Sequence, residues 1–346
     1  GYPAHHTPAV VAPGALQRRC LWSGYVSLDC SMVFWWPVRP LPHARRALLF
    51  WGFLGGLVAL LVWPAWGQMP DFFAQPKGNL LIVGGGDTPL HVVQRYVALA
   101  GGKDKAHIAV LPMASSQGDE EAQEMVADFQ RLGVSAQVVD IAPQDADADS
   151  TAALLEAFTG YWFTGGDQVR LSSLLVGSRA LEVIERRYRE GAAVGGTSAG
   201  ASVMSALMLT GNWRTPHDEE EQEQINIARG MKELAPGFGF FKGAIVDQHF
   251  MHRARYNRLL SAVLDHPQLI GVGIDEETAL LVRPDGVWEV LGTHYVKLFD
   301  ARQARIIDDT RDLLAKASDI RMHVLPDGST FEPRRGKVRF AVPPAP

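Results

Sequence analysis

The sequence predicts an α/β fold built on a mostly parallel sheet, and three observations lead to that prediction. From Asn79 onward, short apolar runs alternate with amphipathic stretches. The apolar runs are continuous rather than alternating, which is typical of strands that crossover helices bury on both faces. Several runs end in a glycine-rich turn, and in such sheets ligands bind outside the carboxyl ends of the strands. We therefore expect a doubly wound sheet with its functional site at that edge.

The elements are expected in a regular order along the chain. The first series of strands comprises 79–83, 106–111, 134–141, 160–163 and 192–195. Helices are expected between them, at 92–97, 120–132, 168–175 and 178–190. A second series follows, with a strand at 243–246, a helix at 253–264 and a strand at 269–274. The runs 279–283 and 287–291 flank a Pro-Asp-Gly turn and predict a closing β-hairpin, with one more strand near 322–325.

The first 68 residues differ in character from the rest of the chain. Two arginines precede an uncharged apolar segment at 47–63, and the small residues Ala65 and Gly67 follow it. Basic, apolar and small residues in that order are typical of a secretory signal peptide. The apolar segment is close to the ~20 residues that span a bilayer, so a membrane anchor is the alternative. We expect an upstream extension and signal peptide over 1–68, a catalytic domain over 69–300, a C-terminal extension over 301–346, and an exported protein, periplasmic or extracellular.

Composition excludes several classes of function. The net charge of −5 and the lack of a basic face argue against nucleic-acid binding. The two cysteines, Cys20 and Cys30, precede the expected cleavage site, which excludes a cysteine nucleophile and a disulfide framework after cleavage. No His, Asp or Glu cluster has the spacing of metal ligands, so we expect neither a metal nor a cofactor.

The pentapeptide Gly196-Thr197-Ser198-Ala199-Gly200 is the strongest chemical signal. A serine between two glycines, after a buried strand and before a helix, is typical of a nucleophile elbow that exposes the hydroxyl on a tight turn. The N–H groups at the start of the helix can stabilise a developing oxyanion. A small-residue turn that only packs well would have the same sequence.

A serine nucleophile needs a base and an acid that holds the base. His249 ends a strand in the run Asp-Gln-His-Phe, so it falls at the same edge as Ser198. The next strand ends in Asp275, Glu276 and Glu277, and one of these carboxylates could hold the histidine. Alternate residues point to opposite faces, which leaves the choice among the three open at this point. The order Ser, His, acid differs from that of α/β-hydrolases and disfavours a standard esterase or lipase.

Four blocks taken together resemble the cyanophycinase family. They are Gly-Gly-Asp-Gln at 165–168, the Ser198 pentapeptide, Asp-Gln-His-Phe at 247–250 with the arginines that follow, and Gly-Ile-Asp-Glu at 273–276. The resemblance covers about 79–291. It implies a class I glutamine-amidotransferase-like (flavodoxin-like) sheet, shared with peptidase E among the serine peptidases.

The resemblance implies a site and a substrate. The implied triad is Ser198, His249 and Glu276, and the backbone of Gly166 or Asp167 with that of Ala199 could form the oxyanion hole. The residues implied to shape the substrate pocket are Gln168, Asp247, Gln248, Arg253, Arg255 and Arg258. The implied reaction cleaves cyanophycin, a poly-aspartate with arginine on each β-carboxyl group, to β-Asp-Arg dipeptides through an acyl-enzyme, in a homodimer.

Residue chemistry agrees with that substrate. Guanidinium groups grip carboxylates in a bidentate fork, and Arg255 and Arg258, three residues apart, would share a helix face. Without the resemblance, a solvated helix surface is the simpler reading of these arginines. Asp167 is placed to bind an arginine of the substrate. The alternatives are an aspartyl dipeptidase of the peptidase E type and a non-catalytic periplasmic peptide-binding protein on the same fold.

Overall fold

The computed structural model describes residues 76–341 except 117, 214–225, 231 and 309–313. The described residues all belong to one compact unit. The apolar segment 47–63 and the expected cleavage site near Gly67 lie outside the described residues. None of the helices in the described ranges has the length and apolar character that a bilayer crossing requires.

The main sheet has nine strands in the order β17-β16-β11-β10-β1-β5-β4-β2-β3. Five neighbouring strands pair in parallel: β1 (Leu80–Val83), β5 (Ala193–Thr197), β4 (Gly160–Phe163), β2 (His107–Leu111) and β3 (Ser135–Val138). The other four extend the sheet with antiparallel pairs: β10 (Thr278–Val282), β11 (Trp288–Gly292), β16 (Thr330–Glu332) and β17 (Lys337–Arg339). The predicted hairpin is therefore present as β10 and β11, and it pairs directly with β1.

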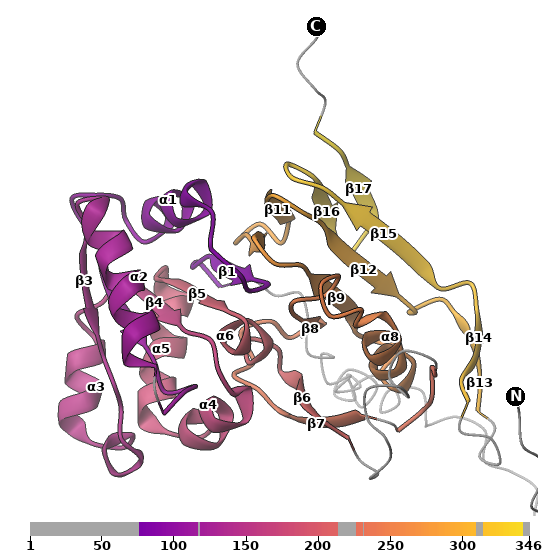
Figure 1. Ribbon diagram of the computed structural model, residues 1–346, viewed down its shortest axis with the longest axis horizontal. Coiled ribbons are helices and arrows are strands. Elements are labelled where there is room, and N and C mark those ends of the chain that lie inside the picture. Colours follow the sequence, from indigo (N-terminus) through magenta and orange to yellow (C-terminus); the bar gives the residue numbers. More distant parts are fainter. Residues whose placement is uncertain (1–75, 117, 214–225, 231, 309–313, 342–346) are drawn as a thin grey trace, which may run out of the picture. The chain divides into compact units, whose positions relative to one another are not determined.

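Helices cover both faces of the parallel strands, as Figure 1 shows. On one face, α1 (Leu90–Leu99) and α2 (Asp119–Arg131) pack against alternate strand residues such as Leu81, Ile108 and Trp162. The opposite face packs against α3 (Asp149–Leu155), α4 (Gln168–Leu175), α5 (Arg179–Glu190) and the short α6 (Ala199–Ser202). Apolar side chains on both sides of β1, β2, β4 and β5 explain why these runs are continuous, whereas Ser135 and Gln137 of the edge strand β3 are exposed. The doubly wound α/β fold that the sequence predicts is thus confirmed.

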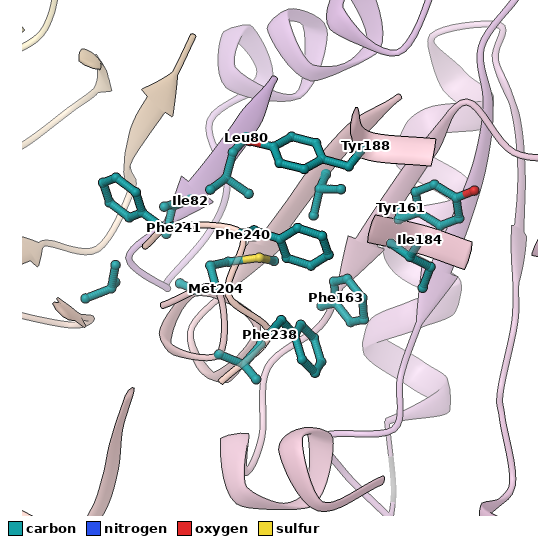
Figure 2. Close-up of a cluster of buried hydrophobic side chains, with 14 of the residues drawn as sticks. Leu80, Ile82, Tyr161, Phe163, Ile184, Tyr188, Met204, Phe238, Phe240 and Phe241 are labelled. Carbon is teal, nitrogen blue, oxygen red and sulfur yellow. The ribbon is translucent and has the colours of Figure 1, made fainter. Parts of the chain in front are cut away.

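Aromatic side chains fill the second of these two interfaces. Figure 2 shows the strand residues Leu80, Tyr161 and Phe163 against Ile184 of α5 and against phenylalanines that follow β7. The ring of Phe163 lies 5.0 Å from that of Phe238. This cluster packs under the turn that follows β5, so it fixes that turn to a rigid core.

A second sheet of four strands has the order β15-β12-β9-β8. Its members are β8 (Ala244–Asp247), β9 (Ile270–Ile274), β12 (Val296–Asp300) and β15 (Arg321–Leu325). Helix α8 (Tyr256–Asp265) packs on it with Leu259 and Val263 in a separate apolar cluster. The strands predicted at 243–246 and 269–274 therefore belong to a sheet of their own rather than to the main one.

Other elements differ from the prediction in detail. The described chain also contains the strands β6 (Leu207–Trp213), β7 (Lys232–Pro236), β13 (Arg305–Ile307) and β14 (Lys316–Ser318), and the 3-10 turn η1 (Pro143–Asp145). Helix α8 begins at Tyr256, not at 253, because Ala254 has a positive φ of 49° and Arg255 is the N-cap. The C-terminal segment 301–346 contributes β15 to the second sheet and β16 to the main sheet.

Candidate active site

Ser198 lies on the turn between β5 and α6 in a strained backbone conformation. Its φ of 53° and ψ of −110° are unusual for a residue with a side chain. The flanking glycines permit the turn because there is no room for a Cβ: one on Gly196 would lie 2.7 Å from the carbonyl oxygen of Gly200, and one on Gly200 would lie 2.3 Å from that of Phe163. The chain therefore presents the Ser198 hydroxyl at the carboxyl edge of the main sheet, as in a nucleophile elbow.

His249 follows β8 of the second sheet and reaches across to the main sheet. Its N–H donates to the carbonyl oxygen of Gly84, at 2.7 Å, just beyond β1. The imidazole packs flat against Gly85, where a Cβ would lie 2.2 Å from the ring Cε1. A glycine is required at that position both by this contact and by its φ of 112°. The end of β1 therefore fixes the position of the base.

Three side chains form a continuous hydrogen-bonded chain. The Ser198 Oγ lies 2.9 Å from His249 Nε2, and His249 Nδ1 lies 2.6 Å from Glu276 Oε1. Glu276 is in the three-residue link that leads from β9 in the second sheet to β10 in the main sheet. The neighbours Asp275 and Glu277, which the sequence left as competitors, are used otherwise. Asp275 accepts hydrogen bonds from the 251–252 backbone, and Glu277, with a φ of 52°, turns the chain into β10.

The environment of His249 keeps its imidazole neutral. Partial burial lowers the pKa of His249, the hydrogen bond to Glu276 acts in the opposite direction, and the nearby guanidinium of Arg253 lowers the pKa further. The net pKa lies below the ordinary value for histidine. At neutral pH the Nε2 atom can therefore accept the proton of the Ser198 hydroxyl.

Two backbone N–H groups beside Ser198 are free to bind an oxyanion. Neither the Gly166 N–H nor the Ala199 N–H has a hydrogen-bond acceptor within the described part of the chain. The Asp167 N–H, by contrast, donates to the carbonyl oxygen of Ala114 at 2.9 Å. The Asp167 carboxylate caps α4 by accepting from the N–H of Val169 at 2.7 Å. Of the three backbone groups expected in the oxyanion hole, the structure leaves Gly166 and Ala199.

Gln168, Asp247 and Arg258, which were expected in the substrate pocket, make hydrogen bonds within the protein that connect neighbouring elements. The Gln168 side chain donates to the carbonyl oxygens of Leu209 and Thr210, both at 2.9 Å. Asp247 is fully buried and accepts from Arg258, whose Nε lies 2.6 Å from its Oδ2. Arg258 is also buried, at 4 % exposure, so this ion pair faces the interior and joins β8 to α8.

The remaining arginines lie on the segment between β8 and α8. Arg255 donates to both the carbonyl and the side-chain oxygen of Gln248, at 2.7 and 2.8 Å, and so braces the residue before His249. Arg253 is exposed and has no ion-pair partner among the described residues. Of the three arginines, Arg253 is therefore the one available to an anionic ligand.

His252, which the sequence did not single out, lies beside Asp275 and Glu276. Its Nδ1 lies 2.9 Å from Asp275 Oδ1, and its Nε2 lies 3.6 Å from Glu276 Oε2. The hydrogen bond to Asp275 raises the pKa of His252. The sequence offered one usable signal, because a histidine three residues after the predicted base falls on the same strand-to-helix connection.

Glu121, in the first turn of α2, was also missed. Its Oε1 accepts the Gly165 N–H at 2.9 Å. A Cβ on Gly165 would lie 3.2 and 3.3 Å from the two carboxylate oxygens and 3.5 Å from the Ser198 Cβ, so a negative charge stands close to the nucleophile. Glu121 lies at the start of the helix predicted at 120–132, and that helix follows a strand that ends at the edge of the site. This position could have identified it.

The site can also be examined for side chains that could bind a metal ion. Within the described ranges there is no group of three or more His, Cys, Asp or Glu side chains that could hold a metal ion. The hydrolytic chemistry that this geometry can perform is nucleophilic attack by Ser198 with His249 as base.

An α/β fold with a strained serine, a neutral histidine and a glutamate in one hydrogen-bonded chain defines a serine-type hydrolase. The chain belongs to peptidase family S51, because the sequence model of that family matches residues 80–290. It is a serine-type peptidase.

Two similar proteins agree with this assignment, and one solved structure is similar in fold. The chain is 32 % identical over 269 residues to the cyanophycinase of Trichormus variabilis, covering 74 % of this chain and 85 % of the relative. It is 33 % identical over 265 residues to that of Geminocystis herdmanii, covering 74 % and 93 %. A crystal structure of a peptidase from an acI-B1 actinobacterium is similar in fold, with a TM-score of 0.53 at 24 % identity, covering 66 % of this chain and 93 % of that one.

Proposed function

We propose that this protein is an exported serine exopeptidase that hydrolyses cyanophycin to β-Asp-Arg dipeptides through an acyl-enzyme. The observation that carries the proposal is the Ser198–His249–Glu276 chain, with 2.9 and 2.6 Å between its members, in a chain one-third identical to cyanophycinases over about three quarters of its length. A substrate of that kind also accounts for charge near the site. Its units carry a carboxylate, which suits Arg253, and a guanidinium, which suits Glu121.

The proposed reaction follows from the geometry. The Ser198 Oγ attacks the scissile carbonyl carbon while its proton passes to His249 Nε2. The Glu276 carboxylate holds the Nδ1–H and stabilises the imidazolium, and the N–H groups of Gly166 and Ala199 bind the oxyanion. The imidazolium then protonates the leaving amine, which departs as the dipeptide. Water, deprotonated by His249, releases the acyl group and regenerates Ser198.

The test compares the protein with its Ser198→Ala variant on purified insoluble cyanophycin. We expect clearing of the suspension and release of β-Asp-Arg by the wild type, and at least a ~10³-fold loss in the variant. Hydrolysis of short aspartyl peptides without clearing would support the peptidase E type instead. No hydrolysis of either substrate and no labelling of Ser198 by a fluorophosphonate would favour a binding protein.

Export is a separate part of the proposal and rests on the residue order of 1–68. Fusion of this segment to a periplasmic reporter should carry the reporter across the inner membrane, and cleavage near Gly67 should shorten it. A full-length fusion that stays with the membrane would indicate an anchor at 47–63. The expected homodimer is tested by sedimentation of the purified protein.

A further inference from the structure

A cleft opens at the carboxyl ends of β2 and β3. Its volume is about 600 Å³, and its walls come from the segments after these two strands and from α4. The exposed polar side chains in its walls belong to three elements: Ser116 follows β2, Asp140 follows β3, and Arg170 and Ser173 lie on α4. No step of the proposed reaction uses this cleft.

Short contacts connect the cleft to the catalytic serine. Ala114, between two residues of the cleft wall, accepts the Asp167 N–H at 2.9 Å, and a Cβ on Gly166 would lie 2.6 Å from the same carbonyl oxygen. Gly166 is adjacent to Gly165, which is close to Ser198. Arg170 is one helical turn beyond Asp167, the N-cap of α4. The wall of the cleft is thus in direct contact with the loop that carries Gly166, one of the two proposed oxyanion donors.

The cleft contains one charge of each sign, and both are unpaired. Arg170 and Asp140 form no ion pair with each other or with any other side chain in the described ranges. Elsewhere on the surface, arginines such as Arg186 and Arg229 have carboxylate partners. An open cleft with a separated cation and anion complements a ligand that carries a carboxylate and a guanidinium on each unit.

The chemistry assigns this cleft to one side of the scissile bond. His249 must reach the leaving amine to protonate it, so the leaving group lies on the His249 side, near Arg253. The acyl part of the substrate then lies on the opposite side of Ser198, along Gly165 and Gly166. The segment of the cleft wall that contains Ala114 contacts this loop, which is why we place the cleft on the acyl side.

We propose that this cleft is a subsite for the acyl side of the substrate, in which Arg170 binds the carboxylate and Asp140 the guanidinium of a unit beyond the scissile one. The proposal rests on the proposed function and names a chain-length specificity for it. The enzyme then prefers oligomers long enough to fill the cleft, because a single unit occupies only the space next to Ser198.

The experiment measures kcat and KM for β-Asp-Arg oligomers of two, three and four units with wild type, Arg170→Ala and Asp140→Asn. We expect each substitution to raise KM for the longer oligomers about fivefold, as for the loss of one partly exposed ion pair, and to leave kcat and the two-unit KM unchanged. The controls are Arg131→Ala and Asp104→Asn, exposed residues outside the cleft. Equal KM changes at all lengths, or changes equal to those of the controls, would overturn the subsite.

Binding by the Ser198→Ala variant separates this inference from the proposed function. We expect its affinity for four units, measured by calorimetry, to exceed that for two, and Arg170→Ala to remove the difference. If wild type turns over no oligomer while this length-dependent binding persists, the proposed reaction fails and the subsite stands. If the affinity is independent of length, the subsite is wrong even when the enzyme is active.

Discussion

The two halves of the active site are held in place by different physical means. Ser198 belongs to the main sheet, where close backbone contacts of Gly196 and Gly200 and a packed aromatic core fix the turn. His249 and Glu276 belong to the second sheet and its link to the first, where charged side chains act in addition to the contacts of His249 with Gly84 and Gly85. The buried Asp247–Arg258 pair and the Asp275–His252 contact flank them on either side.

This difference has consequences for how each half responds to change. A backbone contact is sensitive to added volume and insensitive to pH, because no titratable group takes part in it. An ion pair is sensitive to the loss of one partner and to protonation. Activity should therefore be sensitive to added side-chain volume at the Ser198 turn. It should be sensitive to the loss of charged side chains around His249 and Glu276.

The largest expected effect arises where the halves meet, at Gly85. In Gly85→Ala the new methyl group would lie 2.2 Å from His249 Cε1, so the ring must leave its position between Ser198 and Glu276. We expect a loss in kcat of about 10³-fold or more, as when a triad member is removed. The control is Gly177→Ala, where φ is also positive, at 81°, and a Cβ would have nothing within 4 Å. Comparable activity in the two variants would show that the packing against Gly85 does not position the base.

The second largest effect is expected on the free energy of unfolding, through the buried Asp247–Arg258 ion pair beside His249. Asp247→Ala leaves the guanidinium of Arg258 buried without its main partner, and we expect the free energy of unfolding to fall by about 3–5 kcal/mol. Replacing both residues, as in Asp247→Leu with Arg258→Met, should recover part of that loss because Arg258 no longer leaves a buried unpaired charge, although Arg255, 3.7 Å from Asp247, still loses a partner. Urea unfolding measures both. The comparison variant is Arg95→Ala, which removes an exposed 3.9 Å contact to Glu289 and should cost less than about 1 kcal/mol.

The sequence predicted the parts of the site that depend on local pattern. Continuous apolar strands ending in glycine turns, or in His249 and Glu276, indicated one functional edge and a serine nucleophile. The fold class followed from the same runs because burial on both faces leaves a clear signal. Strand existence was more accurate than strand extent, since only 135–138 of the predicted 134–141 is strand.

The remaining features depend on partners distant in the sequence. Nothing local distinguishes Asp247, which is buried against Arg258, from Arg253, which faces solvent, although both lie beside the same histidine. Assignment of β8 and β9 to a second sheet likewise depends on their pairing with β12, which follows them in the chain. The residues alone left the choice between Glu276 and its neighbours open, and only the resemblance named Glu276, because the turn at Glu277 is not visible in the local pattern.

The charge of Arg253 should affect the pH dependence of the reaction at Ser198 through the pKa of His249. His249 must be neutral to act as base, so activity falls as the pH drops through its pKa. Because the Arg253 guanidinium lowers that pKa, Arg253→Gln should move the acid limb of the rate profile to higher pH. The rate of Ser198 labelling by a neutral fluorophosphonate is the suitable measurement, since that probe needs no arginine for binding. Arg253→Lys keeps the charge and should leave the limb in place. A shift in the opposite direction would mean that Arg253 does not act on the base electrostatically.

The smallest expected effect is the pH dependence of stability at His252. Its pKa is raised in the folded protein by the hydrogen bond to Asp275, so its contribution to stability is fully present below the unfolded value of about 6.5. That contribution is lost as the pH rises through the folded pKa. The His252→Gln variant should therefore lower Tm more at pH 5.5 than at pH 9. If the loss for His252→Gln is independent of pH, the contact contributes only as a neutral hydrogen bond. The electrostatic stabilisation of this half of the site would then come from the Asp247–Arg258 ion pair rather than from His252.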